Sequence, residues 1–226
     1  VRFFSVPEYA LSGAILSIDL DAIGETTYDL PTLDDEDRPG TDDAGDPFGG
    51  NAGKNQALLV PGGPVQVHAS GFRNPYDVLI TSAGHMYTSD NGPNADWGDV
   101  PVGEGTSTCT NDLSDPGDQL RDNFHHIPGA GYYGGHPNPT RAWTGNTFNA
   151  SNPQSPVSES NSVECDYRAP GTEDGALATF NRSTNGLTEY TTAHFGGALQ
   201  GDLFAASLGN RIERITLSSD GTAATN

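Results

Sequence analysis

The chain has 226 residues, with 30 acidic side chains against 10 basic ones and a formal net charge of −20. This charge argues against a nucleic-acid binder, because phosphate binding requires a basic surface. Glycine (29) and proline (16) interrupt every window of helical length, which argues against a helical bundle. No stretch reaches the roughly 20 apolar residues of a membrane span. Between disorder and a loop-rich β domain, the aromatic residues and alternating segments favour the β domain.

Short segments in which apolar and polar residues alternate are predicted to be strands. The first is Ala14–Leu20. The clearest pair is Gly201–Ser207 and Arg211–Leu217, which a Leu-Gly-Asn turn joins into a hairpin. Further strands are predicted at 64–68, 77–81, 85–89, 177–180 and 187–190. Two acidic, glycine-rich segments, 31–56 and 90–162, are predicted to be long loops.

Residues 1–226 are expected to form a single all-β domain that is part of a β-propeller. The repeated order of strand, short turn, strand and acidic loop is typical of the hairpins of propeller blades. At about 40–50 residues per blade the chain supplies about three blades, fewer than a closed ring needs. The alternative is a different β architecture, such as a sandwich. Because the chain opens at Val1 without an initiator Met, we expect the remainder of the ring, or further domains, in a longer chain.

The two cysteines, Cys109 and Cys165, are 56 residues apart, which is neither a zinc spacing nor a redox spacing. We expect them to form one disulfide that closes a long loop; the alternative is two free thiols. Aspartate is in excess and Lys54 is the one lysine of the chain. Together these features indicate a secreted protein, extracellular or periplasmic.

The segment Gly71–Asp99 is the most informative about function, because one arginine stands there in a loop between two predicted strands. Loops at the rim of a sheet are where binding sites are built, and the Arg73 guanidinium is a permanently charged donor for a carboxylate or quinone oxygen. Asn74 adds an amide, and residues 90–94 offer the oxygen ligands that a hard cation such as calcium prefers. The alternative is that Arg73 pairs with a nearby aspartate and that residues 90–94 form only a turn.

Three motifs in this order resemble those of the soluble quinoprotein glucose/sorbosone dehydrogenases. They are Gly-x-Arg-Asn-Pro at 71–75, Asp-Asn-Gly-Pro-Asn at 90–94 and Gly-Tyr-Tyr-Gly-Gly-His-Pro at 131–137. Members of that family are six-bladed β-propellers that use pyrroloquinoline quinone (PQQ) and calcium to oxidise sugars. The whole chain resembles the C-terminal half of such a ring. The resemblance implies hydride transfer from a sugar hydroxyl to the quinone, with a sugar or glycan as the partner.

The resemblance also implies roles for individual residues. Arg73 matches the catalytic arginine that faces the cofactor and the negative charge that develops on it. Asn74 matches a cofactor-contacting asparagine, and His136 would lie near the mouth of the cofactor site. The calcium ion that polarises the quinone would be bound at Asp90, Gly92 and Pro93, the last two through their backbone carbonyls.

Three features depart from the family pattern. Family enzymes commonly have His before the arginine, where this chain has Phe72. The sequence of residues 95–99 also differs from the family pattern. The family's general-base histidine belongs to a blade that this chain does not contain, so the chain alone is not expected to catalyse. These departures favour the alternative function, a non-catalytic, calcium-stabilised module that binds carbohydrate or protein within a large secreted protein.

A second group of acidic residues lies in the loop 31–56. Aspartates interrupted by glycines resemble calcium loops in kind, although the spacing of an EF-hand is absent. The group is expected either to hold a structural calcium ion or to be a solvated acidic loop. Its members are Asp34, Asp35, Asp37, Asp42, Asp43 and Asp46.

Overall fold

The fold is described from a computed structural model of the chain. The described residues are 13–25, 27–28, 32–33, 56–57, 60, 62–92, 99–103, 110–112, 121–135, 175–181 and 183–225. This part of the chain is mostly β, with the short helix α1 (Leu20–Ile23) and the 3-10 turn η3 (His194–Gly197), as the alternating segments predict. No helix within these ranges is long and apolar enough to cross a membrane.

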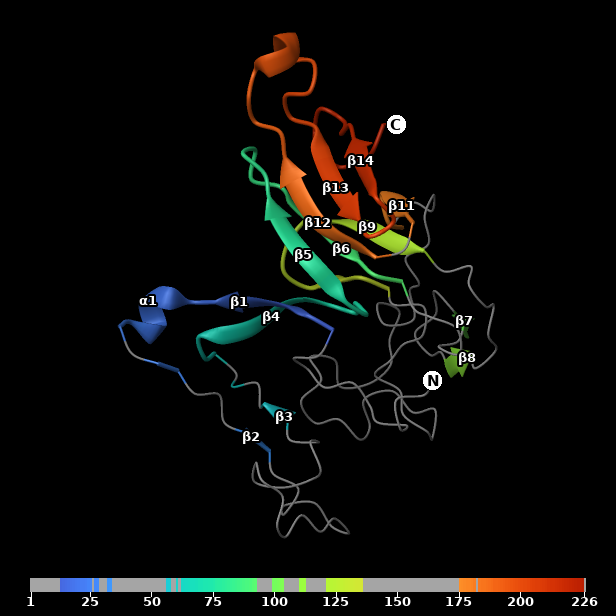
Figure 1. Ribbon diagram of the computed structural model, residues 1–226. Coiled ribbons are helices and arrows are strands. Elements are labelled where there is room, and N and C mark those ends of the chain that lie inside the picture. The colour runs from blue at the N-terminus through green and yellow to red at the C-terminus, as the bar shows by residue number, and fades with distance from the viewer. Residues whose placement is uncertain are drawn as a thin grey trace.

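Three sheets make up the described fold, in which most strands pair in antiparallel fashion (Figure 1). The first sheet contains β1 (Ile15–Ile18), β4 (Val65–Ser70) and β10 (Tyr132–Tyr133), with β10 parallel to β4. The middle sheet is ordered β5 (Pro75–Ile80), β6 (Met86–Asp90), β9 (Asp122–Ile127) and β11 (Ala178–Phe180). The third sheet contains β12 (Thr184–Glu189), β13 (Leu203–Ser207) and β14 (Arg211–Ile215). Two short pairs lie apart: β2 (Thr32–Leu33) with β3 (Gln56–Ala57), and β7 (Asp99–Val102) with β8 (Thr110–Asp112).

The predicted hairpin of β13 and β14 is confirmed, the predicted strands 77–81 and 85–89 also pair as a hairpin, β5 with β6, and turn chemistry explains both. Between β5 and β6 the Thr81 N–H donates to the His85 carbonyl at 2.9 Å, and Gly84 takes a left-handed φ of 85°. Between β13 and β14, Asn210 takes a φ of 58°, a conformation that asparagine tolerates well. The first predicted strand, 14–20, ends earlier, at Ile18, because the Asp19 carboxylate accepts a hydrogen bond from the Ala22 N–H and caps α1.

Apolar side chains from the three sheets form two cores, one on each face of the middle sheet. Between the middle and third sheets, Tyr87 stacks on Phe124, with ring centroids 5.4 Å apart and planes at 9°, and both rings are fully buried. The other members of this core are Phe180, Leu187, Leu203, Ala205 and Ile215. On the opposite face, Ala69, Phe72 and Ile127 join the first sheet to the middle one. The middle sheet is therefore packed between the first sheet and the third.

The segment 90–162, predicted to be mostly loop, contains the strands β7, β8, β9 and β10. The prediction is wrong for β9, a central strand of the middle sheet. Both faces of β9 are buried, and polar side chains make up part of each buried face. Its sequence, Asp-Asn-Phe-His-His-Ile, therefore shows no alternation of apolar and polar residues. In the loop 31–56, the structure describes backbone pairing at 32–33 and 56–57.

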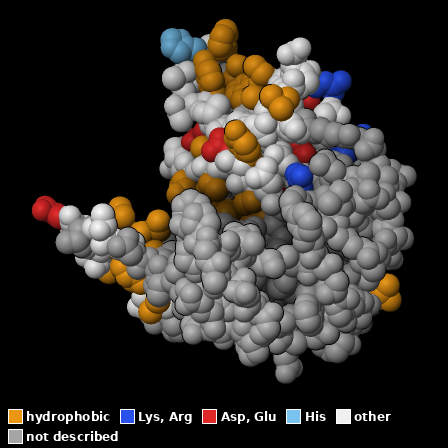
Figure 2. Space-filling model, turned by 60° about the horizontal axis from the view of Figure 1, so that its bottom comes forward, with side chains coloured by type: hydrophobic (Ala, Val, Ile, Leu, Met, Phe, Trp, Pro, Cys, Tyr) orange, Lys and Arg blue, Asp and Glu red, His pale blue; other side chains and the backbone are white. Residues whose placement is uncertain are grey.

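Charged side chains are scattered on the face shown in Figure 2. Most of its described area consists of hydrophobic side chains (orange) and of backbone or other side chains (white). Several large apolar side chains are exposed, among them Ile80 on β5 and Ile212 on β14. The acidic loop 34–46 lies outside the described residues, so its role as a calcium loop stays a prediction.

Stability is expected to fall as the pH is lowered below about 6.5, because of His126 on β9. Its ring lies 5.4 Å from that of His85 and 5.2 Å from that of Tyr87. Burial, and then the neighbouring His85, lower the pKa of His126 below its usual 6.5, while Asp220 acts in the opposite direction. On acidification the unfolded chain therefore binds this proton before the folded chain does. The stabilisation is complete above the unfolded pKa and is lost as the pH falls through the folded one.

Urea unfolding at about pH 7.5 and about pH 5.5 checks this expectation. The loss of stability on acidification should be smaller in His126→Gln, which keeps the size and polarity of the side chain without its titration. If the variant loses as much stability as the unmodified chain, His126 is not the group responsible.

Candidate functional site

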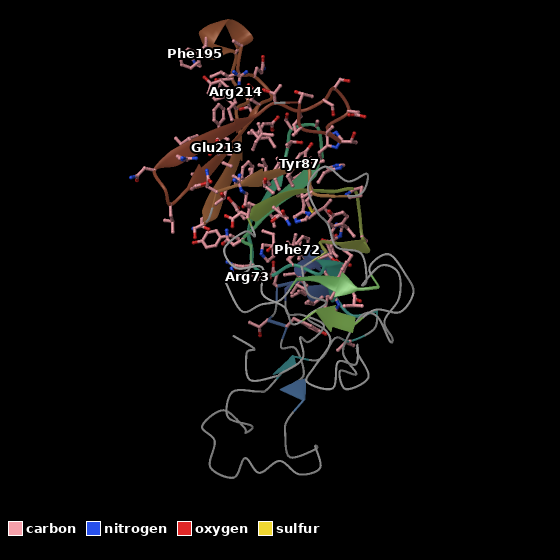
Figure 3. The ribbon with its side chains drawn as sticks, turned by 90° about the vertical axis from the view of Figure 1, so that its right-hand side faces the viewer. Phe72, Arg73, Tyr87, Phe195, Glu213 and Arg214 are labelled. Carbon is pink, nitrogen blue, oxygen red and sulfur yellow. The ribbon has the colours of Figure 1, made fainter. Side chains whose placement is uncertain are left out.

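The loop between β4 and β5 carries Arg73 and is held by its neighbours on both sides. Phe72 is fully buried, donates its backbone N–H to the Gly13 carbonyl at 3.0 Å, and meets the His125 ring edge-on at 5.5 Å. Arg73 is half-buried and Asn74 is exposed. Figure 3 shows Phe72 and Arg73 close to each other and apart from Tyr87, which lies nearer to the third sheet. The loop thus buries its aromatic residue and carries the guanidinium nearer to solvent.

Asp90, at the end of β6, fixes the backbone of this loop. Its carboxylate accepts the backbone N–H of Asn74 at 2.6 Å through Oδ1 and that of Arg73 at 3.1 Å through Oδ2. The side chain is 5% exposed, so these charge-assisted hydrogen bonds are shielded from water. Both oxygens are engaged by N–H groups. Asp90 therefore anchors the loop, and its predicted role as a calcium ligand stays a prediction.

The turn after β6 is joined to the same loop by further hydrogen bonds. The Asn91 N–H donates to the Asn74 carbonyl at 3.1 Å, and the Asn74 Nδ2 group donates to Asn91 Oδ1 at 2.9 Å. Arg73 Nη1 donates to the Asn91 carbonyl at 3.5 Å. The second motif thus supports the first directly. Arg73 contacts Asp90 through its backbone N–H, so the predicted alternative, in which the Arg73 side chain pairs with a nearby aspartate, stays a prediction.

The third motif also meets the first. Gly71 lies beneath the Tyr133 ring, and Gly134 lies beneath the Phe72 ring; a Cβ atom at either glycine would overlap the facing ring. The Gly134 N–H donates to the Ser70 carbonyl at 2.7 Å. The β5–β6 pairing thus joins the first two motifs, and the described part of the third, 131–135, packs on Gly71 and Phe72 beside Arg73.

Asp122, at the start of β9, is a member of the site that the sequence did not reveal. It is 2% exposed. Its Oδ1 accepts the Gly92 N–H at 3.0 Å, and its Oδ2 accepts the Thr184 N–H at 2.6 Å and the Asn91 Nδ2 group at 3.1 Å. These partners are 30 to 62 residues away in the chain, so no local pattern identifies them. The one signal in the sequence is an acidic residue at the start of a segment that contains aromatic side chains.

Several predicted site residues lie outside the described residues. They are Pro93, His136, the calcium-loop aspartates Asp34, Asp35, Asp37, Asp42, Asp43 and Asp46, and the cysteines Cys109 and Cys165. Gly92 is described and half-buried. Among the described residues, no group of three or more His, Cys, Asp or Glu side chains could hold a metal ion. Among the described residues, a calcium site at this turn would draw on backbone carbonyls such as that of Gly92.

The arrangement can hold an anionic group at a rigid rim. Arg73 supplies a delocalised cation, Asn74 an exposed amide, and the buried carboxylates of Asp90 and Asp122 fix the backbone behind them. Electrostatic stabilisation is most effective when the donors are already oriented before the ligand arrives. Comparisons with protein-family models, with curated proteins and with solved structures found no match to this chain.

Proposed function

We propose that this chain is part of a β-propeller related to the PQQ-dependent sugar dehydrogenases, with Arg73 and Asn74 facing the quinone. The observation that carries the proposal is the convergence of the three motifs, because Asp90 fixes the Arg73 loop and Tyr133 packs on Gly71. Strand pairing brings them together, β5 with β6 for the first two motifs and β10 with β4 for the third, and so places Arg73, Asn74 and the 90–92 turn side by side. A guanidinium held in this way suits the charge that develops when a quinone accepts hydride.

The sheet arrangement supports the propeller part of the proposal. The middle sheet is a meander of four antiparallel strands that follow chain order, interrupted by β7, β8 and β10, and the third sheet is a meander of three consecutive strands. They pack face to face, and the Leu187 N–H of β12 donates to Asp77 Oδ2 of β5 at 2.9 Å. The first strands of the two meanders are thus adjacent, as they are in neighbouring propeller blades.

In this proposal Arg73 and Asn74 contact PQQ, and Gly92 contacts calcium. PQQ is an anionic quinone and, when bound, supplies the acceptor for a hydride. Arg73 would neutralise charge on its oxygens, and Asn74 would orient it from the exposed side of the loop. Gly92 would hold a calcium ion through its carbonyl, whereas the hydrogen bonds of Asp90 leave that residue as an anchor.

PQQ binding, followed by quinone absorbance in a titration with excess calcium, tests this function. The unmodified chain is expected to bind PQQ, and Arg73→Ala is expected to weaken binding by about tenfold or more, the loss of one charge-assisted interaction. Arg211→Ala, in an exposed residue of β14, is the matched control and should bind like the unmodified chain. If adding PQQ to the unmodified chain causes no change in quinone absorbance, the proposal is rejected.

A non-catalytic binding module is the second candidate, and one observation favours it. Phe72, at the position where family enzymes commonly have histidine, is fully buried in the core between the first and middle sheets. It can take no part in chemistry at the rim. Such a module would bind a glycan or protein within a larger secreted protein, and this binding should survive Arg73→Ala. A secreted location and the Cys109–Cys165 disulfide stay predictions of this scheme.

A further inference from the structure

We infer that Asp122 is a positioning residue for Arg73. It orients the guanidinium through the Asn91–Gly92 peptide. The inference rests on the proposed function of Arg73 as the residue that faces an anionic ligand. Asp122 lies in another strand, and its carboxylate accepts hydrogen bonds from Asn91, Gly92 and Thr184. Its effect on the guanidinium therefore passes through the turn between them.

The peptide group between Asn91 and Gly92 joins the two side chains. Its N–H donates to Asp122 Oδ1 at 3.0 Å. A trans peptide is planar, with its C=O directed opposite to its N–H, and the described residues include no cis peptide. The Asn91 carbonyl therefore points away from Asp122, and it accepts a hydrogen bond from Arg73 Nη1 at 3.5 Å. A carboxylate on one side of the peptide thus sets where the acceptor for the guanidinium lies on the other.

The Asn91 side chain is fixed by the same carboxylate. Its Nδ2 group donates to Asp122 Oδ2 and to the Thr184 carbonyl, each at 3.1 Å. Its Oδ1 accepts the Asn74 Nδ2 group at 2.9 Å. Rotation of the turn would break all of these bonds together, so Asp122 holds both the backbone and the side chain of Asn91 in one orientation.

The carboxylate is itself held by the third sheet. The Thr184 N–H of β12 donates to Asp122 Oδ2 at 2.6 Å. The Thr184 hydroxyl and Ser207 Oγ lie 2.7 Å apart, which ties this point to β13. Because these groups are buried, the hydrogen bonds are strong and their geometry is well defined. The packing of the third sheet on the middle one is thereby transmitted to the rim where Arg73 lies.

Asp122→Asn tests the inference, because it keeps the shape of the side chain while one acceptor oxygen becomes an NH2 group that cannot accept an N–H. Asp77→Asn is the matched control. Asp77 also accepts a backbone N–H of β12, from Leu187 at 2.9 Å, but none of its described hydrogen bonds reaches the 90–92 turn. Both variants should lose stability in urea. Only Asp122→Asn should weaken PQQ binding, by about fivefold or more, equivalent to the loss of about one hydrogen bond.

A second readout is independent of PQQ. Hydrogen exchange of the backbone amides of Arg73 and Asn74 should be faster in Asp122→Asn than in Asp77→Asn. If Asp122→Asn does not fold, Asn91→Ala removes the side-chain link alone and should give a smaller effect in the same direction on both readouts.

The outcomes separate the inference from the function. If the unmodified chain does not bind PQQ, the proposed function fails, and the exchange of the 73–74 amides still decides whether Asp122 orders the loop. If the unmodified chain binds PQQ and the two aspartate variants bind it equally, with equal exchange at 73–74, the positioning role of Asp122 is overturned.

Discussion

Phe124→Ala is expected to lower the free energy of unfolding by about 3–5 kcal/mol, the usual cost of removing a fully buried aromatic ring. Phe124 is completely buried, stacks on Tyr87 and lies 5.6 Å, centroid to centroid, from Phe180. It belongs to the core that includes Leu203 of the third sheet. Alanine would leave a cavity between two sheets whose backbones are held by hydrogen bonds and cannot close over it. Urea unfolding, monitored by far-ultraviolet circular dichroism, measures the loss.

Ile212→Ala provides the comparison. This side chain is 73% exposed on β14, so its removal should change stability by no more than about 0.5 kcal/mol. Similar losses at the two positions would mean that the core between the middle and third sheets is not the main source of stability. The order in which the sheets are stacked would then need revision.

The strands that the sequence predicts correctly are those that bury apolar side chains on one face. In β5, half-buried and exposed residues alternate, and Leu79 packs on the core while Ile80 is exposed. The turn after β5 is equally predictable, because it contains Gly84, which takes a left-handed φ. Local patterns of this kind require no knowledge of the rest of the chain.

β9 shows why other elements could not be predicted. Its faces carry His125, which meets Phe72 and Tyr132, and His126, which meets His85 and Tyr87. Polar residues of this kind are buried only because distant segments supply their partners. A single sequence contains no sign of such pairing, and the strand therefore resembles a loop.

The sequence predicts individual residues of the candidate site but not the hydrogen bonds that connect them. The loop position of Arg73 between two strands follows from the glycine and proline around it. The roles of Asp90 and Asp122 as anchors do not, because they depend on backbone N–H groups 16 to 62 residues away. The residue type of Asp90 suits a metal ligand. A carboxylate at a turn serves equally well as an acceptor for the backbone, and its hydrogen bonds favour this second role.

Gly71→Ala is expected to destabilise the chain by about 3 kcal/mol or more, through two additive causes. The φ of Gly71 is 78°, a left-handed conformation that costs a residue with a Cβ atom about 1–2 kcal/mol. The new Cβ would also overlap Cε2 of the Tyr133 ring. That ring is 3% exposed and cannot swing into solvent without opening the core, so overpacking adds a further penalty of about 1–3 kcal/mol.

Gly84→Ala separates these causes, because Gly84 has a similar φ of 85° and a Cβ atom added there would have no other atom within 4 Å. It should lose only the conformational part, about 1–2 kcal/mol in urea unfolding. The difference between the two variants then measures how tightly the Arg73 loop is packed against Tyr133. Equal losses would show that the ring moves aside, and the loop would lack the rigidity that anion binding at Arg73 requires. A large difference, together with weaker PQQ binding in Gly71→Ala alone, would indicate that contact between the first and third motifs holds the guanidinium in place.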